Sequence, residues 1–234
     1  MKVAASLIGF LLLGCGGPPE PAESPAAPPA EEPAPAEEAA PAPEAPPAEE
    51  AAPEPAPVPA AYSDVTEKLS EGALPASLYL KWEIESYGTI IAELYTKDAP
   101  KNVTNIANLA IEGFYDGLTF HRIVPGFVVQ GGDPKGTGAG GTGYTVPAEI
   151  ARKHEKGCLA MARKPDKVNP KKESSGCQFY FCLDDLTELD GNYTVIGKIV
   201  EGLEVMEALG AAETGKKEKP KKKIVMKKVT VLTR

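Results

Sequence analysis

The first quarter of the chain lacks the residues that a folded core needs. Residues 16–61 contain no lysine, no arginine and no aromatic side chain, whereas they hold sixteen of the 24 prolines and ten glutamates. A segment with so little hydrophobic surface and so much like charge does not bury enough apolar area to fold. We therefore predict a disordered Pro/Ala/Glu-rich linker over residues 16–61 and one folded domain over residues 62–234, a length that suits a single core.

The predicted domain also lacks a large excess of positive charge. The formal net charge of the chain is −8, but the linker holds ten negative charges and the leader holds Lys2, so the domain itself is near +1. The eight lysines between residues 216 and 228 form a local basic run, which fits a solvated hairpin before a final strand. We expect no nucleic-acid partner.

Histidine and cysteine are scarce, and their spacing argues against a metal site. The chain has two histidines, His121 and His154, and the cysteines Cys158, Cys177 and Cys182 do not have the paired spacing of zinc ligands. We expect no metal and no other cofactor. Cys158 and Cys182 flank two predicted neighbouring strands, so either a disulfide or simple apolar packing fits them.

A short apolar leader opens the chain. Residues 1–15 carry Lys2, then an apolar run over residues 3–13, then Gly14 and Cys15, a pattern typical of a secretory signal. The run is too short to span a bilayer comfortably. Residues 12–15 resemble the lipobox of bacterial lipoproteins, in which the cysteine is acylated; an ordinary cleaved leader is the alternative.

The lipobox resemblance implies that acyl chains on Cys15 anchor the protein to a membrane. The domain is then expected in the cell envelope, with the periplasmic face of an outer membrane as one destination. The linker of residues 16–61 would hold the domain away from the lipid surface, because proline stiffens the chain and the glutamates repel one another.

Alternating hydrophobicity predicts a domain made mainly of short strands. Residues 77–86 and 88–95 alternate apolar and polar side chains around a short bend, which indicates an antiparallel pair. Six further β-rich runs are separated by turn-rich segments, at residues 118–123, 127–130, 158–162, 178–183, 193–199 and 224–232. So many strands favour a closed antiparallel barrel, since closure removes exposed edges.

Helical patterns occupy three segments. Residues 63–71 have the composition of a short helix. A second helix is expected to begin at Pro100, which fits a first helical turn, and to close at Gly113. Residues 203–209 form a third amphipathic pattern. The last two helices are expected to cap the barrel.

Residues 120–133 gather polar and aromatic side chains in two strand fragments joined by a Pro-Gly turn, with the order Phe-His-Arg-Ile-Val-Pro-Gly-Phe-Val-Val-Gln-Gly-Gly-Asp. The hairpin brings Arg122, Phe127 and Gln130 close together, so that a cation, an aromatic ring and an amide meet at one surface. Strand alternation predicts Phe120 and Arg122 on one face, and His121 with Ile123 on the other.

This stretch resembles the signature of the cyclophilin family of peptidyl-prolyl isomerases. Further segments are similar to other family segments, at residues 136–144, 159–162, 175–181 and 189–198. The resemblance covers nearly all of residues 76–234. It implies a mainly β fold, a closed eight-stranded cyclophilin-like barrel with two capping helices, and a monomer that isomerises X-Pro bonds in proline-containing polypeptides during the folding of exported proteins.

The resemblance also implies the site residues. Arg122, Gln130 and Phe127 match the catalytic positions, with Gln130 holding the substrate backbone. The substrate-binding positions, which include the apolar slot for the proline ring and its rim, are His121, Met161, Ala162, Gln178, Phe179, Tyr180, Leu189 and Tyr193.

Several positions depart from the family pattern. Tyr180 replaces a phenylalanine and Tyr193 replaces a histidine. Glu188 stands where many members carry a tryptophan that contacts cyclosporin, so we expect weak sensitivity to that drug. The loop of residues 163–174 contains five lysines or arginines; it either biases substrate choice or is a solvated insertion.

The chemistry explains why an arginine is needed and a nucleophile is not. Amide resonance raises a rotation barrier of ~18–20 kcal/mol, and a twisted X-Pro amide returns the lone pair to the prolyl nitrogen. The permanently charged guanidinium of Arg122 can donate to that nitrogen or to the carbonyl oxygen. The alternative function is a non-catalytic module that binds proline-containing segments as a chaperone or scaffold.

Overall fold

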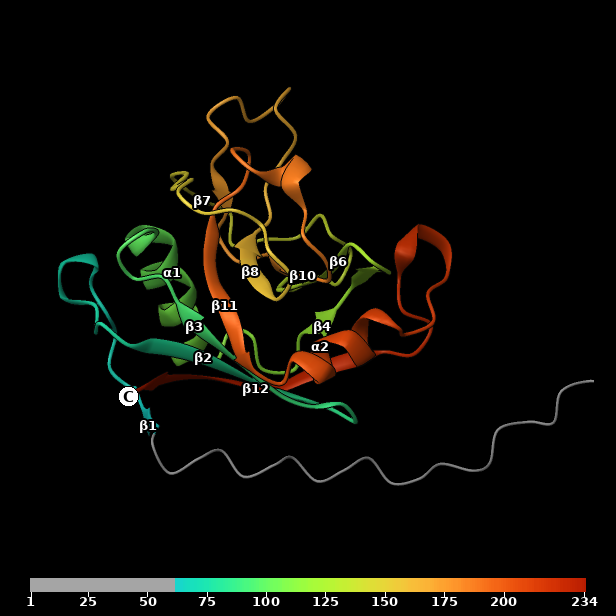
Figure 1. Ribbon diagram of the computed structural model, residues 1–234, viewed down its shortest axis with the longest axis horizontal. Coiled ribbons are helices and arrows are strands. Elements are labelled where there is room, and N and C mark those ends of the chain that lie inside the picture. Colours follow the sequence, from blue (N-terminus) through green and yellow to red (C-terminus); the bar gives the residue numbers. More distant parts are fainter. Residues whose placement is uncertain (1–61) are drawn as a thin grey trace, which may run out of the picture. The chain divides into compact units, whose positions relative to one another are not determined.

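The computed structural model describes residues 62–234 (Figure 1). The predicted signal, the predicted lipidation site at Cys15 and the predicted linker lie outside the described residues. Within them, no helix is long and apolar enough to cross a membrane. The described part is mainly β with two α-helices, which confirms the predicted fold class at that level.

Twelve short strands, all paired antiparallel, account for most of the regular structure of residues 62–234. Their bounds are β1 Ser63–Asp64, β2 Leu78–Ile84, β3 Gly88–Leu94, β4 Thr119–Phe120, β5 Arg122–Val124, β6 Val128–Gly131, β7 Thr145–Val146, β8 Cys158–Met161, β9 Ser174–Ser175, β10 Phe179–Cys182, β11 Val195–Glu201 and β12 Ile224–Thr233. The helices are α1 Pro100–Ile111 and α2 Leu203–Gly210, with 3-10 turns η1 Glu71–Ala73, η2 Thr187–Leu189 and η3 Lys216–Glu218.

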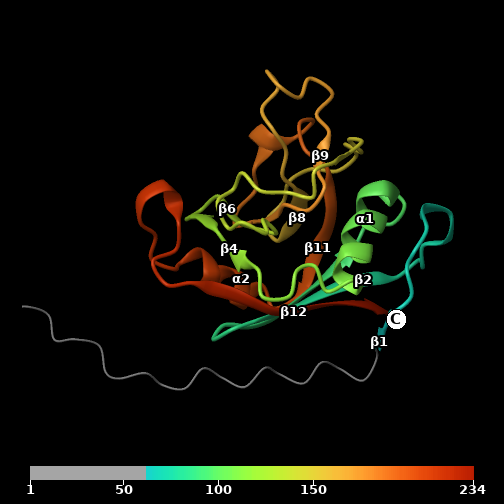
Figure 2. The same cartoon turned by 180° about the vertical axis from the view of Figure 1, so that it is seen from behind.

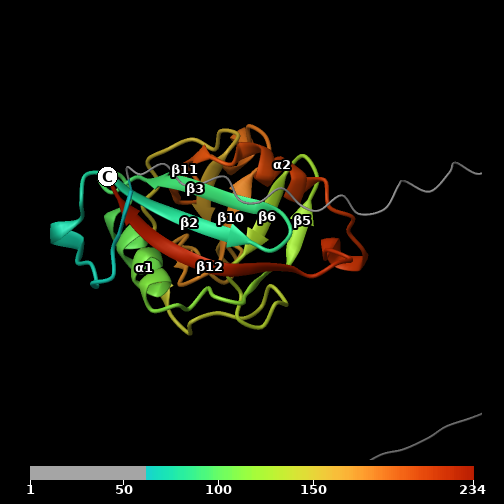
Figure 3. The same ribbon diagram turned by 90° about the horizontal axis from the view of Figure 1, so that it is seen from below.

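Ten of the strands share one sheet in the order β1-β12-β2-β3-β11-β8-β10-β6-β5, with β4 paired to β12, and β7 and β9 form a separate pair. Over residues 62–234 this hydrogen-bonded order is open. Its two far regions are nevertheless joined by one chain segment. β4 pairs with β12, whereas β5, which follows after the single residue His121, pairs with β6; Figure 3 labels β12, β6 and β5.

The local signals explain the elements that were predicted correctly. β2 and β3 pair across the bend at residues 85–87, as the alternation indicated. Pro100 is the first residue of α1, and Gly113, just after its end, has a positive φ of 71° that favours glycine. The two helices lie at different ends of the domain (Figures 1 and 2).

The predicted helix at residues 63–71 is wrong. Ser63 and Asp64 pair with Thr233 and Leu232 at the end of β12, and only the short turn η1 follows. The unpaired edge of β12 offers backbone hydrogen bonds that a short isolated helix cannot match. The ring of Tyr62 also packs edge-on against that of Tyr79, with centroids 5.0 Å apart.

Two apolar clusters lie on opposite faces of the central strands. The larger one, here called the inner core, includes Trp82, Phe179 and Phe181, all with 0% exposure. The smaller one, here called the outer cluster, covers the other face of β6, β8, β10 and β11. Its buried members are Val128, Cys158, Ala160, Tyr180, Cys182, Leu186 and Val195, and its partly buried members are Tyr95, Val124, Phe127, Ala162, Leu189 and Tyr193.

Candidate active site

Arg122, Gln130 and Tyr180 lie in one row across three neighbouring strands. Arg122 on β5 is directly opposite Gln130 on β6, and Gln130 is directly opposite Tyr180 on β10. Directly opposed residues of antiparallel strands project to the same face of the sheet. The strand register therefore starts the side chains of Arg122, Gln130 and Tyr180 from the same face of the sheet, the face that carries the outer cluster.

The apolar part of the predicted slot is only partly where the resemblance put it. Phe127, Ala162, Leu189 and Tyr193 are partly buried against the outer cluster, on the same face as Tyr180. They leave an apolar surface beside the row of Arg122, which suits a proline ring.

Met161 and Phe179 require a correction. They are opposite each other on β8 and β10, and both are 0% exposed in the inner core. Phe179 precedes Tyr180 by one residue, so strand alternation turns its side chain to the opposite face. The structure therefore does not bring Met161 or Phe179 to the slot. Val128, which sequence reasoning missed, lies on the slot's face instead.

The expected alternation around Arg122 is also wrong. Phe120 and Ile123 both lie in the inner core, and the ring of Phe120 is 6.3 Å from those of Phe179 and Phe181. The reason is the break between β4 and β5 at His121, which shifts the alternation by one residue. Arg122 is thus not on the same face as Phe120, and its side chain keeps 35% of its exposure.

His121 is buried rather than at an exposed rim. It is 5% exposed, and neither ring nitrogen has a hydrogen-bond partner among the described residues. Burial lowers the pKa of His121; Arg122 and Lys219 lower it further, while Asp133 opposes them. The imidazole is therefore neutral at pH 7, and the positive charge at this end of the row comes from Arg122.

A chain of hydrogen bonds orients Gln130. Its Nε2 donates to Oε1 of Gln178 at 2.9 Å, and Nε2 of Gln178 donates to the carbonyl oxygens of Gly138 and Gly140 at 3.0 and 2.7 Å. Gln178 is 6% exposed, so it acts as a fixed support. Gln130 is held in place with its own carbonyl oxygen unpaired within residues 62–234.

Asp133 holds the glycine-rich loop that supports Gln178. Its carboxylate accepts hydrogen bonds from the backbone N–H groups of Lys135, Thr137, Gly138 and Gly140, at 2.6 to 3.1 Å. Burial alone would raise the pKa of Asp133, but these four donors outweigh it, and the pKa is lowered. The loop is thus organised around the carboxylate of Asp133.

The floor of the slot contains a second polar chain. Asp190 Oδ1 lies 2.9 Å from Nδ1 of His154 and also accepts the backbone N–H of His154 at 2.8 Å, while Nε2 of His154 lies 3.2 Å from the hydroxyl of Tyr180. A carboxylate only accepts, so Nδ1 of His154 carries a proton, and Nε2 pairs with the hydroxyl of Tyr180. The hydroxyl that departs from the family pattern is therefore satisfied internally.

Tyr193 and Arg163 form one wall of the slot. The ring of Tyr193 meets that of Tyr180 edge-on, with centroids 6.0 Å apart, and the guanidinium carbon of Arg163 lies 4.6 Å from the ring centre of Tyr193. Nε of Arg163 donates to the carbonyl oxygen of Asn192 at 2.6 Å. The loop of residues 163–174 is thus fastened to the site at its first residue.

A pocket of about 630 Å³ adjoins the row on the side of the glycine-rich loop. It shares Gln130 and Gln178 with the site, and Ala162, Arg163 and Lys164 form its opposite wall. The pocket therefore lies directly beside Gln130 and its support Gln178.

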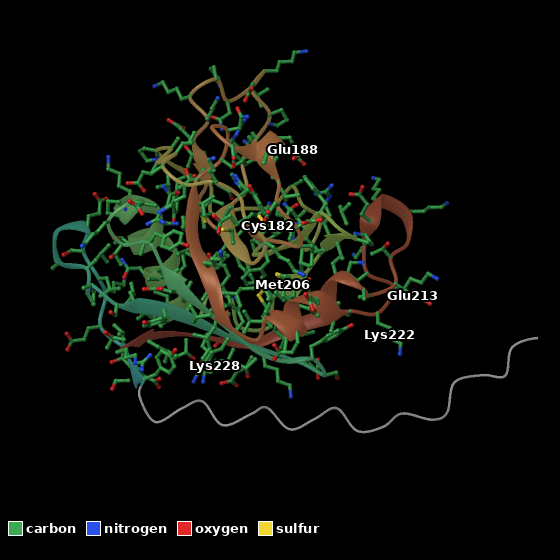
Figure 4. All side chains as sticks on the ribbon, in the orientation of Figure 1. Cys182, Glu188, Met206, Glu213, Lys222 and Lys228 are labelled. Atoms are coloured by element: carbon green, nitrogen blue, oxygen red, sulfur yellow. The ribbon has the colours of Figure 1, made fainter. Side chains whose placement is uncertain are left out.

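The cysteines of the described residues are unbonded. Cys158, Cys177 and Cys182 are all free and buried, and Cys158 and Cys182 belong to the outer cluster. Burial raises the pKa of all three thiols. Of the two alternatives left open by the sequence, this arrangement is the apolar packing and not the disulfide; Figure 4 marks Cys182.

The fold and site define an antiparallel β domain whose face carries an arginine beside an apolar surface, and three comparisons with known proteins agree on its family. A family model described as cyclophilin type peptidyl-prolyl cis-trans isomerase/CLD matches residues 79–231. A peptidyl-prolyl cis-trans isomerase of Helicobacter pylori is 46% identical over 127 residues, covering 52% of this chain and 74% of the relative. Peptidyl-prolyl cis-trans isomerase B of Bacillus subtilis is 47% identical over 124 residues, covering 52% of this chain and 82% of the relative.

Solved structures agree. The crystal structure of a cyclophilin type peptidyl-prolyl cis-trans isomerase from Cryptosporidium parvum matches with a TM-score of 0.63 and 32% identity, covering 68% of this chain and 99% of that one. The chain belongs to the cyclophilin-type peptidyl-prolyl cis-trans isomerase family.

Sequence reasoning missed several residues that shape the site. Val128 could have been found, because it is two residues from Gln130 and therefore on the same face of β6. His154 and Asp190 had no local signal, since each supports the site from a loop. Glu218, which contacts Arg122, is 96 positions away from it in the sequence.

Proposed function

We propose that residues 62–234 catalyse cis/trans isomerisation of X-Pro bonds in polypeptides. One observation carries the assignment of roles: the register that sets Arg122, Gln130 and Tyr180 in one row beside the apolar residues Phe127 and Leu189. A structure of the Cryptosporidium parvum relative was determined in the presence of the dipeptide Ala-Pro, which supports proline-containing peptides as ligands here.

The geometry suggests how each group acts. The proline ring rests on Phe127, Leu189 and Tyr193, so it stays still while the preceding carbonyl rotates. Gln130 holds the substrate backbone. Arg122 donates to the twisted amide, whose nitrogen has regained its lone pair, and each ~1.4 kcal/mol of preference for that state is worth a tenfold rate. A guanidinium keeps its charge at all relevant pH values.

A protease-coupled proline-isomer assay tests this function directly. The purified chain is expected to accelerate isomerisation, and Arg122→Ala is expected to lower kcat/KM by about 10²-fold, the order found when one preorganised donor is removed. The alternative, a binding module without catalysis, predicts that the wild-type chain binds a proline peptide and leaves its isomerisation rate unchanged.

We propose further that the sheet closes into a cyclophilin-like barrel. The segment of residues 119–124 supports this, because its first part pairs with β12 and its second with β6. Closure would make this segment the seam, with Arg122 on it. If the barrel is closed there, hydrogen-exchange measurements should show that the backbone amides of β4 exchange as slowly as those of β12, and not faster.

The cellular setting is a separate proposal. We infer that a lipid on Cys15 tethers the domain to the cell envelope as a monomer, with exported proteins as clients; the support is the lipobox-like segment of residues 12–15 and the linker composition. Palmitate labelling of wild type against Cys15→Ser, followed by membrane fractionation, tests it. Labelling and membrane association that persist in Cys15→Ser would refute the anchor.

A further inference from the structure

The guanidinium of Arg122 is held by a carboxylate from a distant loop. Nε of Arg122 donates to Oε2 of Glu218 at 2.6 Å, and the two side chains are 35% and 48% exposed. A hydrogen bond between a charged donor and a charged acceptor is among the stronger contacts available to a side chain. Over residues 62–234, Glu218 is the one carboxylate that pairs with Arg122.

Glu218 sits on a folded hairpin, here called the Glu218 hairpin, that comprises residues 213–221. Thr214 and Pro220 form a β-bridge, the N–H of Gly215 donates to the carbonyl oxygen of Lys219 at 2.8 Å, and the N–H of Lys221 donates to that of Glu213 at 2.8 Å. Figure 3 shows this segment, in red, beside β5, the strand that carries Arg122.

The backbone of the hairpin is strained where it delivers Glu218. Lys217 and Glu218 have φ values of 59° and 58°, in the left-handed region that residues other than glycine seldom adopt. Such conformations persist where the surrounding structure holds them, and they concentrate at functional sites. The hairpin thus holds two residues in unfavourable backbone conformations at the point from which Glu218 contacts Arg122.

Glu218 is the one negatively charged side chain in a lysine-rich stretch of the sequence. Between residues 216 and 228 the chain has eight lysines and one carboxylate, Glu218. Any lysine in its place would repel Arg122. The lysines beside it also keep the local potential positive, and Lys219 is close enough to His121 to lower the pKa of that ring. Glu218 can therefore fix the guanidinium without removing the positive field of the site.

We propose that Glu218 is a positioning residue for the isomerisation. It binds Nε of Arg122 and so leaves both terminal amino groups of the guanidinium for the X-Pro amide. A long, solvated arginine side chain otherwise samples many rotamers, and only the rotamer that faces the row with Gln130 assists the reaction. This inference rests on the proposed function, since it assigns Glu218 a part in that same reaction.

Matched variants of the purified chain test the role. Glu218→Ala is expected to lower kcat three- to tenfold and to change KM less than twofold, because the proline slot is untouched. Glu218→Gln keeps an acceptor oxygen for Nε and is expected to retain at least half of the wild-type kcat. Glu213→Ala, on the same hairpin but paired with Lys221 at 3.0 Å, is the control and is expected to match wild type (Figure 4).

A double-mutant cycle separates positioning from general damage to the hairpin. In an Arg122→Ala background, Glu218→Ala is expected to cause no further loss of kcat. A loss of the same size in both backgrounds overturns the proposal. So does a Glu218→Ala chain that is as active as wild type or more active, because the carboxylate would then be idle or inhibitory.

A spectroscopic readout keeps the proposal separable from the proposed function. The Nε–H resonance of Arg122 is expected to be visible and slow to exchange in the wild-type chain and in Glu218→Gln, and lost in Glu218→Ala. An exchange-broadened signal in the wild type refutes the contact whether or not the chain is active. Conversely, loss of activity in Arg122→Ala alone supports the proposed function whatever Glu218 does.

Discussion

At the scale of single residues, Glu188 is one position that departs from the pattern implied by the sequence resemblance. Glu188 is exposed on η2, next to Leu189 of the slot. A carboxylate there offers no large apolar face to a cyclic peptide drug, where the resemblance places a tryptophan in many members. Figure 4 shows Glu188 on a different part of the surface from Glu213.

Restoring the tryptophan therefore has a defined expected effect. Glu188→Trp should lower the inhibition constant for cyclosporin by at least about tenfold, which corresponds to ~1.4 kcal/mol, since an aromatic ring adds buried contact area at low entropic cost. Thr187→Trp, one residue away on the same exposed turn, is the control. If the inhibition constant falls by the same factor in both variants, position 188 does not contact the drug in the way that the resemblance implies.

His121 predicts a pH dependence of stability. Burial lowers the pKa of His121 in the folded chain below the ~6.5 of an unfolded chain. As the pH falls below ~6.5, the unfolded state therefore binds more protons than the folded state. This contribution to stability is complete above pH ~6.5 and is lost as the pH falls toward the folded pKa. Urea unfolding between pH 7 and pH 5 should show a smaller loss of stability in His121→Gln than in wild type; identical slopes would contradict this origin.

At the scale of elements, the glycine-rich loop depends on one carboxylate. Asp133 accepts four backbone N–H groups, and the loop in turn holds Gln178. Asp133→Ala is expected to lower the free energy of unfolding by about 1–3 kcal/mol, because several donors lose a charged acceptor and some regain water.

The same variant should also lower isomerase activity, since Gln178 orients Gln130. Asp185→Ala is a suitable control, because Asp185 accepts one backbone N–H, that of Lys156, at an exposed site. Thermal and urea unfolding measure the first effect and the proline-isomer assay measures the second. If Asp133→Ala is as stable and as active as the wild type, the glycine-rich loop does not depend on this carboxylate.

Elements that depend on contacts within a few residues could be predicted from the sequence, whereas elements that depend on distant contacts could not. The β2–β3 pair and α1 were predictable, because alternation, a short bend and Pro100 act within a few residues. β1 was not, since its partner Thr233 lies at the other end of the chain. The order that places β10 between β6 and β8 likewise depends on distant pairing.

For the site, the motif around Arg122 and Gln130 located the row, but the role of each apolar residue depended on which face it occupies. Strand alternation from Tyr180 would have excluded Phe179 from the slot, whereas the shift at His121 comes from a break between strands that no local pattern marks. Glu218 could not be predicted, because a lysine-rich run is typical of a solvated loop and its contact with Arg122 is purely tertiary.

At the scale of the whole molecule, the strand register brings the candidate site residues onto one face of the sheet. The row of Arg122, Gln130 and Tyr180 exists because β5, β6 and β10 are neighbours in one sheet. The inner core on the other face holds these strands with large buried rings such as Trp82. A rigid sheet of this kind keeps donor and slot at a fixed separation, which is the condition for favouring a half-rotated amide over both planar forms.

The most direct measurement is the catalysed cis/trans exchange rate of a bound proline peptide, followed by NMR together with the peptide's dissociation constant. In Arg122→Ala we expect exchange to slow by about 10²-fold while the dissociation constant changes less than about threefold, because the guanidinium acts on the twisted amide and not on the resting peptide. An unchanged exchange rate, or affinity and rate that fall by equal factors, would contradict this role of Arg122.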